Sequence, residues 1–96
     1  MPKVHRDGDL TTGHDCWPPT IPLTWSINVF ANGLGVVRNT QDGIVEHCCQ
    51  GCHGGTYIGT SSIYVNGTAI QVIGSPVSCG DFAGEGSPDV FAPLGT

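Results

Sequence analysis

Five potential metal ligands stand within a stretch of seven residues near the middle of this chain. Residues 47–53 read HCCQGCH and contain two histidines and three cysteines. A chain of 96 residues rarely gathers so many reactive side chains unless something binds them. Imidazole and thiolate are the ligands that zinc takes in structural sites. Together with His14 and Cys79, which lie far away in sequence, this stretch predicts a structural zinc site.

The chain is so short that a metal site would add substantially to the stability of its fold. Its 96 residues correspond to one domain, covering residues 1–96. A chain of this size buries only about 60–65% of the surface that its unfolded form exposes, so its core is marginal. A structural zinc ion can contribute about 10–16 kcal/mol of coupled binding and folding. We therefore expect a metal to stabilise the fold.

The composition predicts an all-β protein. Fifteen glycines and seven prolines favour turns, and the apolar runs are rich in β-branched and aromatic residues. No segment shows helical periodicity. The net charge is −5, with only three lysines and arginines, which argues against binding to nucleic acid.

The chain also predicts where the protein is made. No apolar run approaches 18 residues, and no apolar stretch follows the N-terminus, so we expect neither a membrane span nor a secretory signal. Synthesis in a reducing cytosol would favour metal binding over disulfides for the five cysteines.

A short pattern occurs three times. Residues 26–33 (SINVFANG), 60–67 (TSSIYVNG) and 87–93 (SPDVFAP) each predict a strand. The two Asn-Gly pairs predict type I′ hairpin turns, because both residues tolerate positive φ. We expect the aromatic residues Phe30, Tyr64 and Phe91 to converge in the core.

A second repeated element delivers the candidate ligands. His14 stands five positions after Asp9, His47 five after Asp42, and Cys79 four after Ser75. Three similar arms that each supply one ligand indicate pseudo-threefold symmetry with a shared apex. The expected fold is thus a small all-β pyramid of three hairpin repeats with a metal at its vertex.

The remaining cysteines leave alternatives open. Cys49 or Cys52 could replace one histidine as a ligand, or the two could form a redox pair, and the role of Cys48 stays open. A Cys52–His53 catalytic dyad is a weaker hypothesis. Cys16 is expected to pack beneath the metal as a small apolar side chain, or to exchange as a ligand.

The sequence also predicts the surroundings of one further histidine and of the two tryptophans. We expect His5 to lie in a strand as a solvated or edge residue. Trp17 and Trp25 are interpreted as anchors in the core or at the rim of the base.

Several motifs together resemble the PAAR-repeat family over nearly the whole chain. They are residues 9–14 (DLTTGH), the repeated Asn-Gly hairpins, residues 76–80 (PVSCG) and residues 86–91 (GSPDVF). The chain departs from the family at residues 70–72, where Ile-Gln-Val replaces a usual basic residue.

This resemblance implies a β-rich cone with zinc at the vertex. The matching ligand positions are His14, His47, His53 and Cys79, and iron is a possible occupant. It also implies that one chain caps the trimeric β-helical spike of a contractile injection machine and touches the target outer membrane transiently. Such a protein is not an enzyme and has no small-molecule substrate. It is made in a bacterial cytoplasm and belongs to a phage virion or to type VI secretion.

Two rival functions remain. One is an independent zinc-binding adaptor that recognises another protein. The other is a small thiol redox protein, which would require a reactive thiol.

Overall fold

The computed structural model describes residues 1–93, and the last three residues of the predicted domain 1–96 lie outside this range. Within the described residues the fold is built from short strands, turns and isolated bridges, without a helix. The all-β prediction is therefore confirmed. A helix long and apolar enough to cross a membrane is accordingly absent from the described part.

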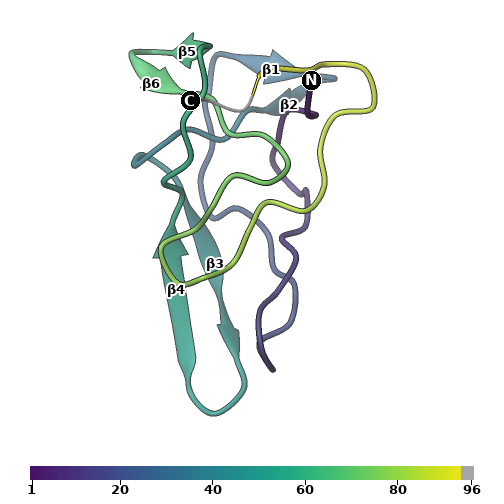
Figure 1. Ribbon diagram of the computed structural model, residues 1–96. Coiled ribbons are helices and arrows are strands. Elements are labelled where there is room, and N and C mark those ends of the chain that lie inside the picture. Colours follow the sequence, from purple (N-terminus) through teal and green to yellow (C-terminus); the bar gives the residue numbers. More distant parts are fainter. Residues whose placement is uncertain (94–96) are drawn as a thin grey trace.

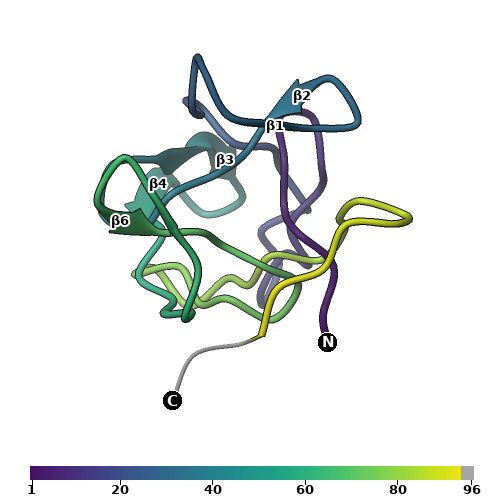
Figure 2. The same ribbon diagram turned by 90° about the horizontal axis from the view of Figure 1, so that it is seen from above.

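Three antiparallel hairpins form the regular structure (Figure 1). They are β1 (Phe30–Ala31) with β2 (Leu34–Gly35), β3 (Gly43–Cys48) with β4 (Cys52–Thr56), and β5 (Tyr64–Val65) with β6 (Thr68–Ala69). The first and third hairpins lie at the same end of the molecule as the N-terminus, while β3–β4 extends to the opposite end. Viewed from above, β1–β2 and β6 lie on different sides of the molecule (Figure 2).

The two Asn-Gly pairs form the predicted turns. Asn32 and Gly33 have φ angles of 54° and 77°, and Asn66 and Gly67 have φ angles of 53° and 86°. A type I′ turn requires positive φ at both central residues. The third copy of the pattern forms no strand of its own, and only Phe91 makes an isolated bridge, to Lys3.

A closed ring of three backbone hydrogen bonds joins distant segments. The N–H of His5 donates to the Gln71 carbonyl at 3.0 Å, that of Gln71 to the Val37 carbonyl at 2.8 Å, and that of Val37 to the His5 carbonyl at 3.1 Å. Each of the three segments is thus bonded to both of the others. This ring ties together the parts of the chain that precede the three candidate ligands His14, His47 and Cys79.

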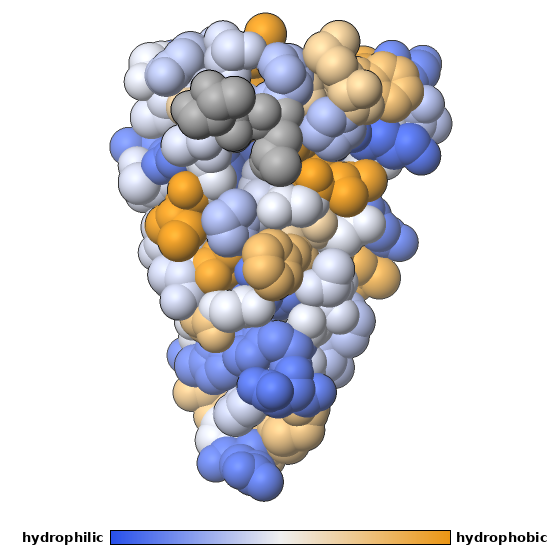
Figure 3. Space-filling model, viewed as in Figure 1, coloured by the Kyte–Doolittle hydropathy of each residue, from blue (hydrophilic) through white to orange (hydrophobic). Residues whose placement is uncertain are grey.

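Two apolar clusters make up the core. The first lies at the end of the molecule that carries β1–β2 and β5–β6, which we call the wide end. It includes Ala31 of β1 and Val65 of β5. The second contains Val37, Ile44, Tyr57, Val77 and Ala83, and Cys79 packs against it. The outline of the molecule narrows from the wide end toward the β3–β4 turn (Figure 3).

The prediction for the repeated aromatic residues was wrong. Phe30, Tyr64 and Phe91 are 57%, 66% and 45% exposed. The residues that follow them, Ala31, Val65 and Ala92, are buried in their place. Successive side chains in extended chain point to opposite sides, so burying the small residue turns the aromatic ring outward.

The prediction for His5 was also wrong, because its side chain is fully buried. Its Nδ1 donates to the Glu85 carbonyl at 2.7 Å, and its Nε2 accepts from the Tyr57 hydroxyl at 2.8 Å. Burial lowers the pKa of His5, so the ring is held neutral. Both ring nitrogens of His5 are thus satisfied inside the protein.

Candidate metal centre

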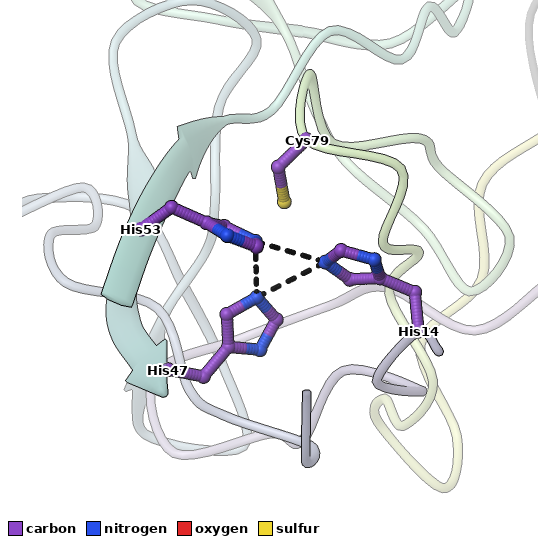
Figure 4. A group of neighbouring side chains, drawn as sticks. All are labelled: His14, His47, His53 and Cys79. Carbon is purple, nitrogen blue, oxygen red and sulfur yellow. Dashed lines mark hydrogen bonds between the residues drawn. The ribbon is translucent and has the colours of Figure 1, made fainter. Parts of the chain in front are cut away.

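Four side chains that sequence alone singled out converge at one point (Figure 4). They are His14, His47, His53 and Cys79, and one ligand atom from each lies within 4.8 Å of all the others. The three Nε2 atoms face one another, at 3.2 Å between His14 and His47, 2.9 Å between His14 and His53, and 2.8 Å between His47 and His53. This cluster could hold a metal ion.

The β3–β4 hairpin positions two of the histidines. His47 is paired directly with His53 across the two strands. The register shifts between Ile44 and His47, so that Val45 and Glu46 oppose the single residue Gly54. Without this bulge His47 would lie opposite Cys52, and the two imidazoles would not meet.

His14 reaches the cluster from a tight turn. Its backbone N–H and carbonyl exchange hydrogen bonds with Trp17 at 3.1 and 2.8 Å. The Trp17 ring stacks on the His14 ring, with centroids 5.3 Å apart and planes 19° apart, and its Nε1 donates to the Gly51 carbonyl. Trp17 thus lies beside the cluster and not at the base, whereas Trp25 packs against the core as predicted.

Cys79 comes from another turn, which the hydrogen bond from the Val77 N–H to the Asp81 carbonyl closes at 2.8 Å. Gly55 of β4 lies against it. A Cβ at Gly55 would come within 2.7 Å of Val77 Cγ1 and 3.1 Å of Cys79 Sγ. The missing side chain at Gly55 is what allows the thiol this close to the hairpin.

Two features favour the neutral, metal-binding form of the imidazole, one at His47 and one at His53. The Nδ1 of His47 lies 2.8 Å from the Pro18 carbonyl, which can only accept, so Nδ1 carries the proton and Nε2 presents its lone pair to the cluster. Loss of solvation, followed by the proximity of His47 and His14, lowers the pKa of His53. A lowered pKa favours the neutral imidazole that binds metals.

The spacing of the nitrogens fits a tetrahedral ion. Zinc–nitrogen bonds of about 2.0–2.1 Å separate the nitrogens of a tetrahedron by about 3.3–3.4 Å. The Nε2 atoms of His14, His47 and His53 are 2.8–3.2 Å apart, so a small outward movement would accommodate the ion. Three neutral imidazoles whose Nε2 atoms face one another can form few hydrogen bonds among themselves. One shared cation could instead accept a lone pair from each of the three nitrogens.

Four of the five cysteines are paired in disulfides, which overturns several hypotheses. Cys16 is bonded to Cys49 and Cys48 to Cys52, leaving Cys79 as the free thiol among the described residues. Cys49 and Cys52 are therefore neither ligands nor a redox pair with each other, and Cys16 is neither apolar filling nor an exchanging ligand. The expectation that these four residues would not form disulfides was wrong, because the fold brings their exposed side chains together in bonded pairs.

Pro18, Gly55 and Trp17 were not recognised from the sequence as supports of the site. Two prolines follow Trp17 in the sequence, and they indicate a turn without indicating which carbonyl meets His47.

No family model matches this chain, and a search of curated proteins finds no match either. What the fold and the site define is a small all-β protein with a His/His/His/Cys cluster that could hold a metal ion.

Proposed function

We propose that this protein is the metal-stabilised tip of a contractile injection machine, similar to PAAR-repeat proteins, and that it acts mechanically without catalysis. The observation that carries the proposal is the position of the cluster. Three imidazoles and one thiol from distant segments meet at the β3–β4 hairpin, which reaches the narrow end of the tapering molecule. A point has little interior to bury, so metal–ligand bonds can stabilise it where apolar packing cannot.

Zinc is the proposed ion, with iron as an alternative. Three neutral imidazoles and one thiolate complete a tetrahedron, which is typical of a structural zinc site. A site with four protein ligands leaves no open position at which water could be activated. The expected role of His14, His47, His53 and Cys79 is therefore to fasten the tip.

Hydrogen bonding along the chain supports the proposal of three equivalent arms. The backbone N–H groups of Arg6 and Arg38 donate to the carboxylates of Asp9 and Asp42 at 2.9 and 2.8 Å. In the third arm the N–H of Val72 donates to the Ser75 hydroxyl at 2.9 Å. A candidate ligand follows each of these turns, as expected for a pseudo-threefold pyramid with the metal at its vertex.

The wide end is the proposed interface with the spike. Each repeat contributes one exposed aromatic residue, namely Phe30, Tyr64 or Phe91. Three similar apolar positions on one chain could each contact one subunit of a homotrimer. One chain would then cap one trimeric β-helical spike, with the opposite end free for transient contact with the target outer membrane. We propose synthesis in a bacterial cytoplasm and a place in a phage virion or a type VI secretion system.

Binding to a trimeric β-helical spike fragment encoded in the same genome tests this function. The expected result is co-purification of one chain per trimer, which Phe91→Ser weakens at least about tenfold. Phe82→Ser is the matched control, because Phe82 is 46% exposed and Phe91 45%, but Phe82 follows the turn that carries Cys79. A metal-loaded monomer without affinity for the spike would favour the adaptor function instead.

A further inference from the structure

The carboxylate of Asp81 is buried beside the metal centre with one oxygen unmatched. Its side chain is 0% exposed. Its Oδ1 accepts hydrogen bonds from the Phe82 N–H at 2.7 Å and from the Thr12 hydroxyl at 3.1 Å. Its Oδ2 is buried and has no hydrogen-bond partner among the described residues. A buried carboxylate oxygen without a partner is costly, so a compensating positive charge is expected nearby.

The nearest candidate for that charge is the metal centre. Oδ2 lies 4.0 Å from Nδ1 of His47, and Asp81 follows Cys79 by two positions. The proton on Nδ1 of His47 is already donated to the Pro18 carbonyl. Asp81 therefore acts on the centre through its charge and not through a hydrogen bond to the ligand.

The charges of the centre balance only when Asp81 is included. A divalent ion with the Cys79 thiolate and three neutral imidazoles carries a net charge of about +1. The Asp81 carboxylate brings this sum to zero, whereas a monovalent ion would leave the centre with a net negative charge. An unbalanced charge is unfavourable here because the Asp81 carboxylate and the His47 ring are themselves buried.

We infer that Asp81 is the charge-balancing residue of the metal centre and that it favours a divalent ion over a monovalent soft ion. The inference rests on the metal centre proposed above. It assigns Asp81 a role outside the ligand set, as a residue that determines which ionic charge the His/His/His/Cys cluster retains.

Asp15 provides a matched control. Its Oδ2 lies 3.6 Å from Nδ1 of His14, closer to a ligand ring than Asp81 is, but its side chain is 82% exposed. Solvent screens an exposed charge far more effectively than a buried one. Removing the charge of Asp15 should therefore have little effect on the metal.

The test compares the dissociation constants of Zn²⁺ and Ag⁺ in wild type, Asp81→Asn and Asp15→Asn. Ag⁺ is a soft monovalent ion that needs no reductant, so the disulfides stay intact. For Asp81→Asn we expect Zn²⁺ to bind about 10- to 100-fold more weakly. Coulomb energy is proportional to the charge of the ion, so the loss for Ag⁺ should be only about 3- to 10-fold. Asp15→Asn should change either constant by less than about twofold.

The outcomes separate this inference from the metal centre itself. Equal losses for Zn²⁺ and Ag⁺, or no loss in Asp81→Asn, would overturn the charge-balancing role while leaving the centre in place. A wild type that binds neither ion would overturn the proposed centre. If Asp81→Asn does not fold, Asp81→Ser is measured in its place. The same unequal losses for Zn²⁺ and Ag⁺ are expected, and equal losses would overturn the inference.

Discussion

Gly55 and Cys79 are in contact at the metal centre, and a Cβ at Gly55 would lie 3.1 Å from the Cys79 sulfur and 2.7 Å from Val77 Cγ1. Gly55→Ala should therefore displace the thiol without removing any ligand. We expect a loss of stability of about 1–3 kcal/mol, as for other overpacked sites, and zinc binding at least about tenfold weaker. Isothermal titration with Zn²⁺ measures the second effect.

The neighbouring Gly54 is the control for that substitution. A Cβ there would meet its nearest atom, the Ile44 carbonyl oxygen, at 3.5 Å, which is ordinary contact. Gly54→Ala should bind zinc as tightly as wild type. Equal weakening by both variants would mean that the hairpin backbone, and not the approach of Cys79, limits the site.

Removing a ligand should lower metal content and thermal stability together. His14→Ala and Cys79→Ser each leave three of the four ligands that converge in the structure. A structural zinc ion contributes coupled folding free energy, so we expect the melting temperature to fall by at least about 10 °C. Metal analysis and calorimetry on the same preparation make the comparison. Wild type treated with a chelator should melt like the variants, and loss of metal with unchanged melting would exclude a structural role.

The two disulfides should contribute unequally to stability. Cys16 and Cys49 are separated by 33 positions and Cys48 and Cys52 by 4. Loop-closure entropy assigns about 4 kcal/mol to the longer loop and about 2 kcal/mol to the shorter one. Denaturant unfolding of Cys16→Ser/Cys49→Ser and of Cys48→Ser/Cys52→Ser compares these values, with metal present throughout. Equal losses of stability would contradict this loop-closure account of the two bridges.

The buried His5 should make stability depend on pH. Its pKa is lowered from 6.5 in the folded protein, first by burial, so the unfolded chain binds a proton that the folded chain does not. The stability is present above pH 6.5 and is lost as the pH falls below that value, by up to about 1.4 kcal/mol per pH unit.

His5→Gln removes this titration and should flatten the curve below pH 6.5. Because the histidines of the metal centre also titrate, both proteins are compared after metal removal. The difference between their unfolding free energies at each pH isolates His5. Identical slopes for His5→Gln and wild type would contradict a neutral, buried His5.

The parts of the fold that local chemistry determines could be predicted from sequence. Asn32 and Asn66 precede glycines, and positive φ at these pairs depends on little beyond the two residues. The parity of the strands could not be predicted, because either Phe30 or Ala31 could have faced the core. The choice depends on how the buried residues packed around Ala31 fill the core, which is a property of the folded chain.

The candidate site was predicted more completely than its surroundings. His14, His47, His53 and Cys79 do come together, as the resemblance to the PAAR-repeat family implied, whereas residue types alone left Cys49 and Cys52 open as ligands. The bulge that pairs His47 with His53 and the Cys16–Cys49 bridge depend on tertiary register, which residue spacing does not encode. The burial of Asp81 likewise emerges only when the whole chain is folded.

The most direct test of the account is a crystal structure of the purified protein with anomalous diffraction data collected across the zinc edge. The account predicts one zinc peak per chain, bonded to Nε2 of His14, His47 and His53 at about 2.0–2.1 Å and to Sγ of Cys79 at about 2.3 Å. An absence of anomalous density in protein prepared with ample zinc, with water among the four side chains, would contradict it.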